Sequence, residues 1–186
     1  MSAVTTLPRI ERGGPFTLAD RDAMPDDGCR YDLVDGALIV TPAPIAAHQL
    51  VQTALVVLLH AALPPEAVLL AAPFDVALLP GVVMQPDVLV ARRSDLSLAN
   101  LPGPPLLAVE IVSPSSRRFD RGLRRDLHEE AGTPAYWVVD PHEVRLQAWD
   151  LRDGRYVQVA DVSGDEPFHA TVPFPVTVVP SALAAG

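Results

Sequence analysis

The apolar segment over residues 106–112, LLAVEIV, contains one ionisable side chain, the carboxylate of Glu110. A short apolar run that includes β-branched residues is typical of a buried strand. Burying an ionised carboxylate without a partner is very unfavourable, so such a group is normally neutralised or paired. Any fold that this chain adopts must therefore bring a compensating group to Glu110.

Length and composition fit a single globular domain. The chain has 186 residues, of which 49% are hydrophobic and 20% are charged, enough to bury a core. We expect residues 1–15 to form a loose N-terminal arm and residues 16–186 to form one domain. The sequence shows neither a signal peptide nor an apolar run of about 20 residues, and Cys29 is the single cysteine. We therefore expect a cytoplasmic protein with no membrane span.

The charged residues are unusual in kind. The net charge is −9, which argues against a broad surface that coats nucleic acid but leaves room for a local basic site. The chain has no lysine, and all 14 basic residues are arginine, as expected of a GC-rich genome. An arginine at a given position therefore does not by itself indicate selection for arginine chemistry.

Helix and strand patterns alternate along the chain. Thr17 and Asp20 form a capping-box pattern for a short helix, and Asp35–Gly36 is a two-residue hairpin signal. Residues 45–63 are apolar almost all round, as in a buried helix. Residues 119–131 form a second helical pattern, which Gly132 is suited to end.

The remaining periodic segments predict strands, separated by turns and by an irregular loop over residues 92–105. The predicted strand segments are 67–80, 86–91, 106–112, 135–140, 143–150, 154–160 and 174–179. This order predicts an α/β or α+β fold in which helices flank a mixed central β-sheet.

Two carboxylates lie in strand contexts, Asp87 and, 23 positions later, Glu110. A divalent ion such as Mg²⁺ takes oxygen ligands, often one or two carboxylates with water and substrate phosphate. Acids on neighbouring strand ends would provide these ligands, and the ion would offset the charge of Glu110. The alternative is that Asp87 merely begins a strand after Pro86 and that Glu110 pairs with an arginine.

Arginines are concentrated just after Glu110, where five of the nine residues 117–125 are Arg117, Arg118, Arg121, Arg124 and Arg125. In an acidic chain this segment is a candidate phosphate-attracting patch.

The second helical pattern places Arg124 at the edge of a buried stripe that includes Leu123 and Leu127, so that Arg124 is able to face a cleft. The alternative is a solvated helix face with i,i+4 pairs, Asp120–Arg124 and Arg125–Glu129.

The segments YDLVDGALIVTPAP, PDVLVA and VEIVSPSSRRFDRGLRRDLHEEAGTPAYWVVDP, together with His48, resemble the Uma2 family. That family is a group of predicted endonucleases with the PD-(D/E)xK restriction-endonuclease-like fold. The resemblance runs from about residue 17 to about residue 156. It implies a restriction-endonuclease-like core.

The resemblance implies roles for four residues. Asp87 matches the metal-binding Asp of the PD motif, and Glu110 matches the acid of the next strand. The residue after that acid, Ile111, would bind the metal through its backbone carbonyl. Asp32 stands where the family commonly has Glu and would be an additional acid. The implied cofactor is Mg²⁺ or Mn²⁺.

The chain departs from the family at its basic residue. Val112 occupies the usual lysine position, two residues after Glu110, and the lysine that Uma2-like sequences have on the following helix is matched by Arg124. Arginine keeps the positive charge but remains protonated and cannot act as a base. His128 stands where the family usually has Tyr, and His48 matches a family position but is also explained as a satisfied helix-surface histidine.

The sequence and its resemblance to the Uma2 family together imply a metal-dependent endonuclease that cleaves DNA, with catalytic residues Asp87, Glu110, Arg124 and Asp32. The remaining arginines of the 117–125 segment would bind phosphate. One alternative is a binding module that keeps the fold and has lost cleavage. Another is an interaction domain, a possible homodimer, whose acids pair with the arginine helix and bind no metal.

Overall fold

The computed structural model describes residues 14–112 and 122–184. Its helices and strands, in chain order, are α1 (Leu18–Asp22), β1 (Arg30–Val34), β2 (Ala37–Thr41), α2 (Ala46–Ala61), β3 (Ala67–Ala71), β4 (Val76–Leu79), β5 (Val82–Met84), β6 (Val88–Arg92), the 3₁₀ helix η1 (Arg93–Asp95), β7 (Leu101–Pro102), β8 (Leu107–Ile111), α4 (Leu123–Ala131), β9 (Ala135–Asp140), β10 (Arg145–Arg152), β11 (Arg155–Ser163), β12 (Phe168–Ala170), β13 (Val176–Val178) and α5 (Pro180–Ala184).

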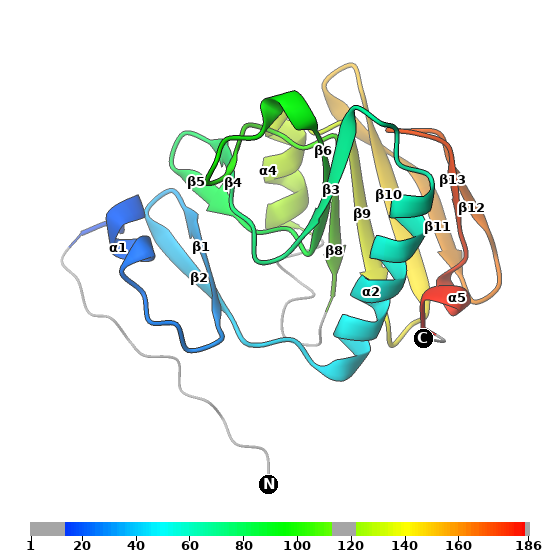
Figure 1. The fold of residues 1–186 in the computed structure, drawn as a ribbon, viewed down its shortest axis with the longest axis horizontal. Helices are drawn as coiled ribbons and strands as arrows, with labels where there is room; N and C mark the ends of the chain where they lie inside the picture. The colour runs from blue at the N-terminus through cyan, green and yellow to red at the C-terminus, as the bar shows by residue number, and fades with distance from the viewer. Residues whose placement is uncertain (1–13, 113–121, 185–186) are drawn as a thin grey trace, which may run out of the picture.

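The strands form two mixed sheets and a small two-stranded ladder (Figure 1). The larger sheet has the order β11-β10-β9-β8-β6-β3, and the smaller has the order β2-β1-β5-β4-β7. Strands β8 and β9 run parallel, and β6 runs antiparallel to β8. The predicted α/β class with mixed sheets is confirmed, but the strands are divided between two sheets instead of forming one central sheet.

Helix α2 covers one face of the six-stranded sheet (Figure 1). Val51, Leu55 and Leu59 belong to one apolar cluster with residues of β6, β8 and β9, including Trp137. These side chains recur every four residues on the helix, so they form a single stripe that faces the sheet. The predicted helix over residues 45–63 is confirmed, and its apolar face forms the main core.

Helix α4 lies against the opposite face of that sheet. Its Leu127 belongs to a second cluster, with Val34 and Met84 of the five-stranded sheet and Leu89 of β6. Because Leu89 alternates with Val88 and Val90, which belong to the first cluster, α2 and α4 lie on opposite faces of β6. Helix α4 therefore packs between the two sheets.

The two sheets are joined by the short connection from β5 to β6. Strand β5 ends at Met84 and pairs with β1 in the smaller sheet, and β6 begins at Val88 in the larger sheet. Residues 85–87 thus pass directly from one sheet to the other. This connection places Asp87 where side chains of both sheets meet.

The helix caps and the hairpin turn that the sequence predicts are confirmed. Thr17 and Asp20 form the capping box of α1, and Gly132 ends α4 in the left-handed conformation with φ 85°. The hairpin turn at Asp35–Gly36 has positive φ at both residues, 47° and 80°, as the favoured two-residue turns require.

One expectation needs correction, and another is tested only in part. The segment 92–105, expected to be irregular, contains η1 and the short strand β7, which pairs in parallel with β4. The helix expected over residues 119–131 is described from Leu123, and residues 119–121 lie outside the described part of the chain.

Among residues 14–112 and 122–184, no helix combines the length and apolar character that crossing a membrane requires.

Candidate active site

Asp87 and Glu110 face one another across two antiparallel strands. The β6–β8 register pairs Val88 with Val109, so one further step in the same register brings Asp87 opposite Glu110. The backbone N–H of Ile111 donates a hydrogen bond of 2.7 Å to Asp87 Oδ2. The two acids predicted to act together are therefore neighbours at one end of the larger sheet.

Asp32 joins these acids from the smaller sheet. It lies on β1, its side chain is 1% exposed, and its Oδ1 accepts a 2.9 Å hydrogen bond from the backbone N–H of Gln85. Since residue 85 begins the connection to β6, this bond fixes Asp32 close to Asp87. All three predicted acids thus belong to one buried cluster.

Arg124 reaches the cluster from α4. Its Nη1 donates to Glu110 Oε1 at 2.9 Å, and its Nη2 forms an ion pair with Asp32 Oδ2. The Arg124 side chain is 2% exposed, so it is not part of a solvated helix face. Leu123, predicted to be buried, is instead 39% exposed, because the face that α4 turns inward includes Arg124.

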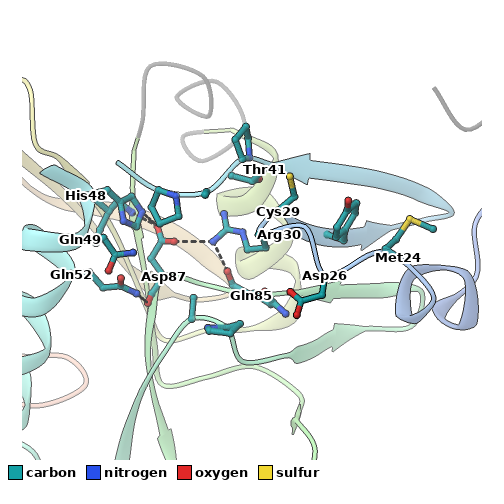
Figure 2. Close-up of a pocket in the computed structure, with 18 of the residues that line it drawn as sticks. Met24, Asp26, Cys29, Arg30, Thr41, His48, Gln49, Gln52, Gln85 and Asp87 are labelled. Atoms are coloured by element: carbon teal, nitrogen blue, oxygen red, sulfur yellow. Dashed lines mark hydrogen bonds and ion pairs between the residues drawn. The ribbon is translucent and has the colours of Figure 1, made fainter. Parts of the chain in front are cut away.

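Arg30 is a member of the site that the sequence did not predict. Its Nη1 donates to Asp87 Oδ1 and to the carbonyl oxygen of Gln85, both at 2.8 Å (Figure 2). Its Nη2 lies 3.9 Å from Glu110 Oε2, and its Nε lies 3.7 Å from Asp32 Oδ2. Residues two apart on a strand share a face, so the spacing between Arg30 and Asp32 was the signal that would have found it.

Helix α2 contributes two polar side chains, one turn apart, that hold Asp87. His48 Nε2 lies 3.2 Å from Asp87 Oδ2, and Gln52 Nε2 donates to the backbone carbonyl of Asp87 at 2.8 Å. Both side chains are buried. His48 is therefore a partner of the PD-motif acid and not a surface histidine (Figure 2).

Asp87 and Arg30 each shift the pKa of the other. Burial tends to raise the pKa of Asp87, but hydrogen bonding to His48 and the charge of Arg30 outweigh it, so its pKa is lowered. Burial and the like charge of Arg124 tend to lower the pKa of Arg30, but Asp87, Glu110 and Asp32 outweigh them, so its pKa is raised. The shifted pKa values of Asp87 and Arg30 therefore favour an ionised carboxylate beside an ionised guanidinium group.

A cavity of about 780 Å³ opens beside the cluster and is lined by residues of α1, β1 and α2 and by the segment that follows β3. Arg30, His48, Asp87 and Ile111 are among its lining residues. Asp32, Glu110 and Arg124 do not line it and are 2% exposed or less. Arg30, which lines the cavity and lies within 4 Å of Asp32 and Glu110, therefore separates these two acids from the open side of the site.

The donor set fits a hard divalent ion in kind. Asp87 and Glu110 offer carboxylate oxygens and Ile111 offers a backbone carbonyl, the ligands that Mg²⁺ and Mn²⁺ prefer. Within the described residues, however, no group of three or more His, Cys, Asp and Glu side chains is arranged as a metal site. In this arrangement arginine nitrogens contact the acids.

The predicted phosphate-binding arginines are only partly described. Arg117, Arg118 and Arg121 lie outside the described residues. Arg125 is 34% exposed, pairs with Asp126 at 2.9 Å and lies over the ring of Trp149 at 5.6 Å. The predicted Arg125–Glu129 pair is replaced by a pair between Glu129 and Arg155, also at 2.9 Å.

His128 is fully buried on α4 next to the cluster. Its Nδ1 lies 2.9 Å from Thr133 Oγ1, and its ring packs 5.3 Å from that of Tyr136. Burial, and to a lesser degree the charge of Arg124, lowers the pKa of His128 to about 3. It is therefore neutral at physiological pH and packs α4 against β9.

Comparison with known proteins identifies the family of this chain. The Uma2 family, described as "Putative restriction endonuclease", matches residues 18–183. The chain belongs to the Uma2 family. The family resemblance seen in the sequence is thus confirmed, and it extends over nearly all the described residues.

Among solved structures, this chain resembles the crystal structure of a protein from Anabaena variabilis ATCC 29413. That protein is described as a putative nuclease belonging to DUF820. The two share 19% sequence identity with a TM-score of 0.70, over 92% of this chain and 98% of that chain. At this identity the likeness establishes the fold. No curated protein matches the chain.

Proposed function

We propose that this chain is a divalent-metal-dependent endonuclease that hydrolyses phosphodiester bonds in DNA. The observation that carries the proposal is the placement of Asp87 opposite Glu110 on adjacent antiparallel strands, with Arg124 ion-paired to Glu110. Two acids and a fixed cation at one strand end are the groups that such hydrolysis needs. Membership of a family described in terms of restriction endonucleases supports the same reaction class.

Asp87, Glu110 and the backbone carbonyl of Ile111 would hold Mg²⁺ or Mn²⁺. A divalent ion supplies the Lewis acid that activates water and neutralises charge on a phosphoryl group. His48 and Gln52 would keep Asp87 in position from α2. Asp32 would hold the guanidinium of Arg124 in place through their ion pair.

Arg124 would stabilise negative charge on the phosphoryl oxygens. A guanidinium group has a fixed fork of donors and matches phosphate well, but it stays protonated. Arg124 therefore acts as an electrostatic group and cannot take a proton from the attacking water. The role assigned to the family lysine is accordingly electrostatic in this chain.

DNA is the proposed partner, and Arg117, Arg118, Arg121 and Arg125 are the proposed contacts to its phosphates. A local basic segment in the sequence suits a chain whose net charge is −9, because phosphate contacts can be local. The homodimer and the cytoplasmic location stay predictions.

A second function is favoured by one specific observation. Asp87 is paired with Arg30 at 2.8 Å and Glu110 with Arg124 at 2.9 Å, so both of the proposed metal-binding acids contact an arginine. This is the arrangement expected of a binding or interaction module that keeps the nuclease fold without binding metal.

A cleavage assay separates the two functions. We expect the wild-type protein to cleave plasmid DNA with Mg²⁺ or Mn²⁺, Glu110→Gln to lose this activity, and Arg124→Lys to keep or increase it. Glu130→Gln is the matched control, since Glu130 is an exposed acid on α4. Cleavage by Arg124→Lys alone would identify a nuclease that has lost activity, and inert wild-type and Arg124→Lys proteins would favour the module.

A further inference from the structure

Arg30 lies where the three acids of the site converge. Its three guanidinium nitrogens face three different carboxylates: Nη1 faces Asp87, Nη2 faces Glu110 and Nε faces Asp32. A cation bound by both Asp87 and Glu110 has to lie between their carboxylates. The guanidinium of Arg30 already reaches both.

The acids hold Arg30 less directly than Arg124, although Arg30 also donates to the carbonyl oxygen of Gln85 at 2.8 Å. Apart from its 2.8 Å bond to Asp87, its separations from the acids are 3.7 and 3.9 Å, longer than hydrogen bonds. Its Nε is buried and has no hydrogen-bond partner among the described residues. Arg124 makes a direct contact with each of two acids and is less exposed, at 2% against 14% for Arg30. Of the two arginines, Arg30 is the easier to displace.

The cavity beside Arg30 provides space for its side chain to move into. It lines the cavity of about 780 Å³, whereas Glu110, Asp32 and Arg124 lie beneath it and line none of that space. Rotation about the side-chain bonds of Arg30 is therefore able to carry its charge into the cavity while its backbone stays in β1. Water there would solvate the guanidinium.

We propose that Arg30 is a built-in competitor of the divalent ion: its guanidinium holds the cation position between Asp87 and Glu110 until a metal displaces it. The inference rests on the proposed function, because it assumes that these acids bind metal. It also reconciles the arginine-paired acids with the proposed metal site, because Asp87 and Glu110 become available to a metal ion when Arg30 moves away.

The competition has a simple electrostatic basis. The electrostatic attraction of Asp87 and Glu110 to a divalent ion would be stronger than their attraction to one guanidinium group. Metal binding must first break the hydrogen bonds from Arg30 to Asp87 and to the carbonyl oxygen of Gln85. The apparent metal affinity is reduced by the fraction of molecules in which Arg30 remains in place. Removing Arg30 therefore strengthens metal binding, whereas removing a ligand weakens it.

The test is the dissociation constant of Mn²⁺, measured with the full chain by calorimetry or by electron paramagnetic resonance. We expect Arg30→Gln to lower this constant at least tenfold. Arg30→Lys, whose compact ammonium group cannot span two acids, should lower it by a smaller factor and covers the case in which Arg30→Gln does not fold. The gain should disappear in the double variant Arg30→Gln/Glu110→Gln.

Arg21→Gln is the matched control. Arg21 lines the same cavity and pairs with Asp75 instead of with one of the three acids, and its loss changes the net charge by the same amount as the loss of Arg30. Its Mn²⁺ constant should equal that of the wild type.

The two failures are distinguishable. If the wild type binds Mn²⁺ through Glu110 and Arg30→Gln binds it no more tightly, the inference is overturned and the proposed function stands. If neither the wild type nor any Arg30 variant binds Mn²⁺ in a manner that Glu110→Gln abolishes, the inference and the metal-dependent function are both overturned.

Discussion

Arg124 is bonded to two carboxylates, Asp32 and Glu110, and all three side chains are almost completely buried. A guanidinium group offers separate nitrogens to separate acids, whereas an ammonium group is a compact point charge. Arginine thus suits a position between acids from two different sheets. The absence of lysine from the chain explains why arginine is common, and this geometry explains how it is accommodated here.

Replacing Arg124 tests its structural contribution. Arg124→Ala leaves Asp32 and Glu110 without this partner inside the protein, so we expect the free energy of unfolding at pH 7 to fall by about 3–5 kcal/mol. Arg124→Lys should recover a large part of that loss. Urea denaturation measures both.

The control is Arg125→Ala on the same helix. Its guanidinium is 34% exposed and pairs with the neighbouring Asp126, so we expect a change within about 1 kcal/mol. A loss for Arg124→Ala that is no larger than that for Arg125→Ala would contradict the network described above.

In helix α4, ion pairs help to determine which face of the helix is buried, and this face differs from the one that the apolar pattern predicts. Its buried residues are Arg124, Leu127 and His128, whereas Leu123 is exposed. A charged side chain is buried in place of an apolar one because Asp32 and Glu110 lie beneath this face. The helix is therefore oriented by the site as well as by the core.

The buried face of α4 predicts a pH dependence of stability. His128 has a pKa of about 3 in the folded protein, lowered first by burial, against about 6.5 in an unfolded chain. Below pH 6.5 the unfolded chain binds a proton that the folded chain does not, so stability is full above pH 6.5 and falls as the pH decreases toward 3. Between pH 7 and 5 the contribution is about 2 kcal/mol.

His128→Gln removes that titration, and Gln keeps a polar group near Thr133. Urea unfolding at pH 7 and at pH 5 should therefore show a smaller decrease for this variant than for the wild type, whatever its absolute stability. His142→Gln, at an exposed position, should behave like the wild type. Lowered carboxylate pKa values act mainly below about pH 4, so an unchanged decrease in His128→Gln would refute the assignment.

Single elements were more predictable than their assembly. Strand β9 has the predicted bounds, and the hairpin turn and α2 were evident because alternation, turn residues and helical stripes are local properties. The division into two sheets was not evident, because strand patterns do not state which strands pair. Arg30 was missed for a related reason: its role depends on Asp87 and Glu110, which are 57 and 80 positions away.

At the scale of the whole molecule, the candidate site joins the two sheets. Asp32 belongs to the smaller sheet and Glu110 to the larger, and Arg124 bonds to both from the helix packed between them. The connection over residues 85–87 adds a covalent link at the same place. We therefore expect binding at this site to act on the stability of the whole fold and not on one loop.

Divalent metal should accordingly stabilise the whole chain against unfolding. An ion that binds the folded state alone adds RT ln(1 + [L]/Kd), which is about 2.7 kcal/mol at a concentration 100 times Kd. We expect Mg²⁺ to raise the midpoint of thermal unfolding of the wild type and to have much less effect on Glu110→Gln, because this variant loses the charge of a proposed ligand. Glu130→Gln, which removes an exposed acid from α4, should respond like the wild type and corrects for general binding of cations to an acidic protein. An equal effect of Mg²⁺ on the thermal unfolding of Glu110→Gln and Glu130→Gln would contradict the metal site. The buried Glu110 carboxylate would then be a partner of arginine and not a metal ligand.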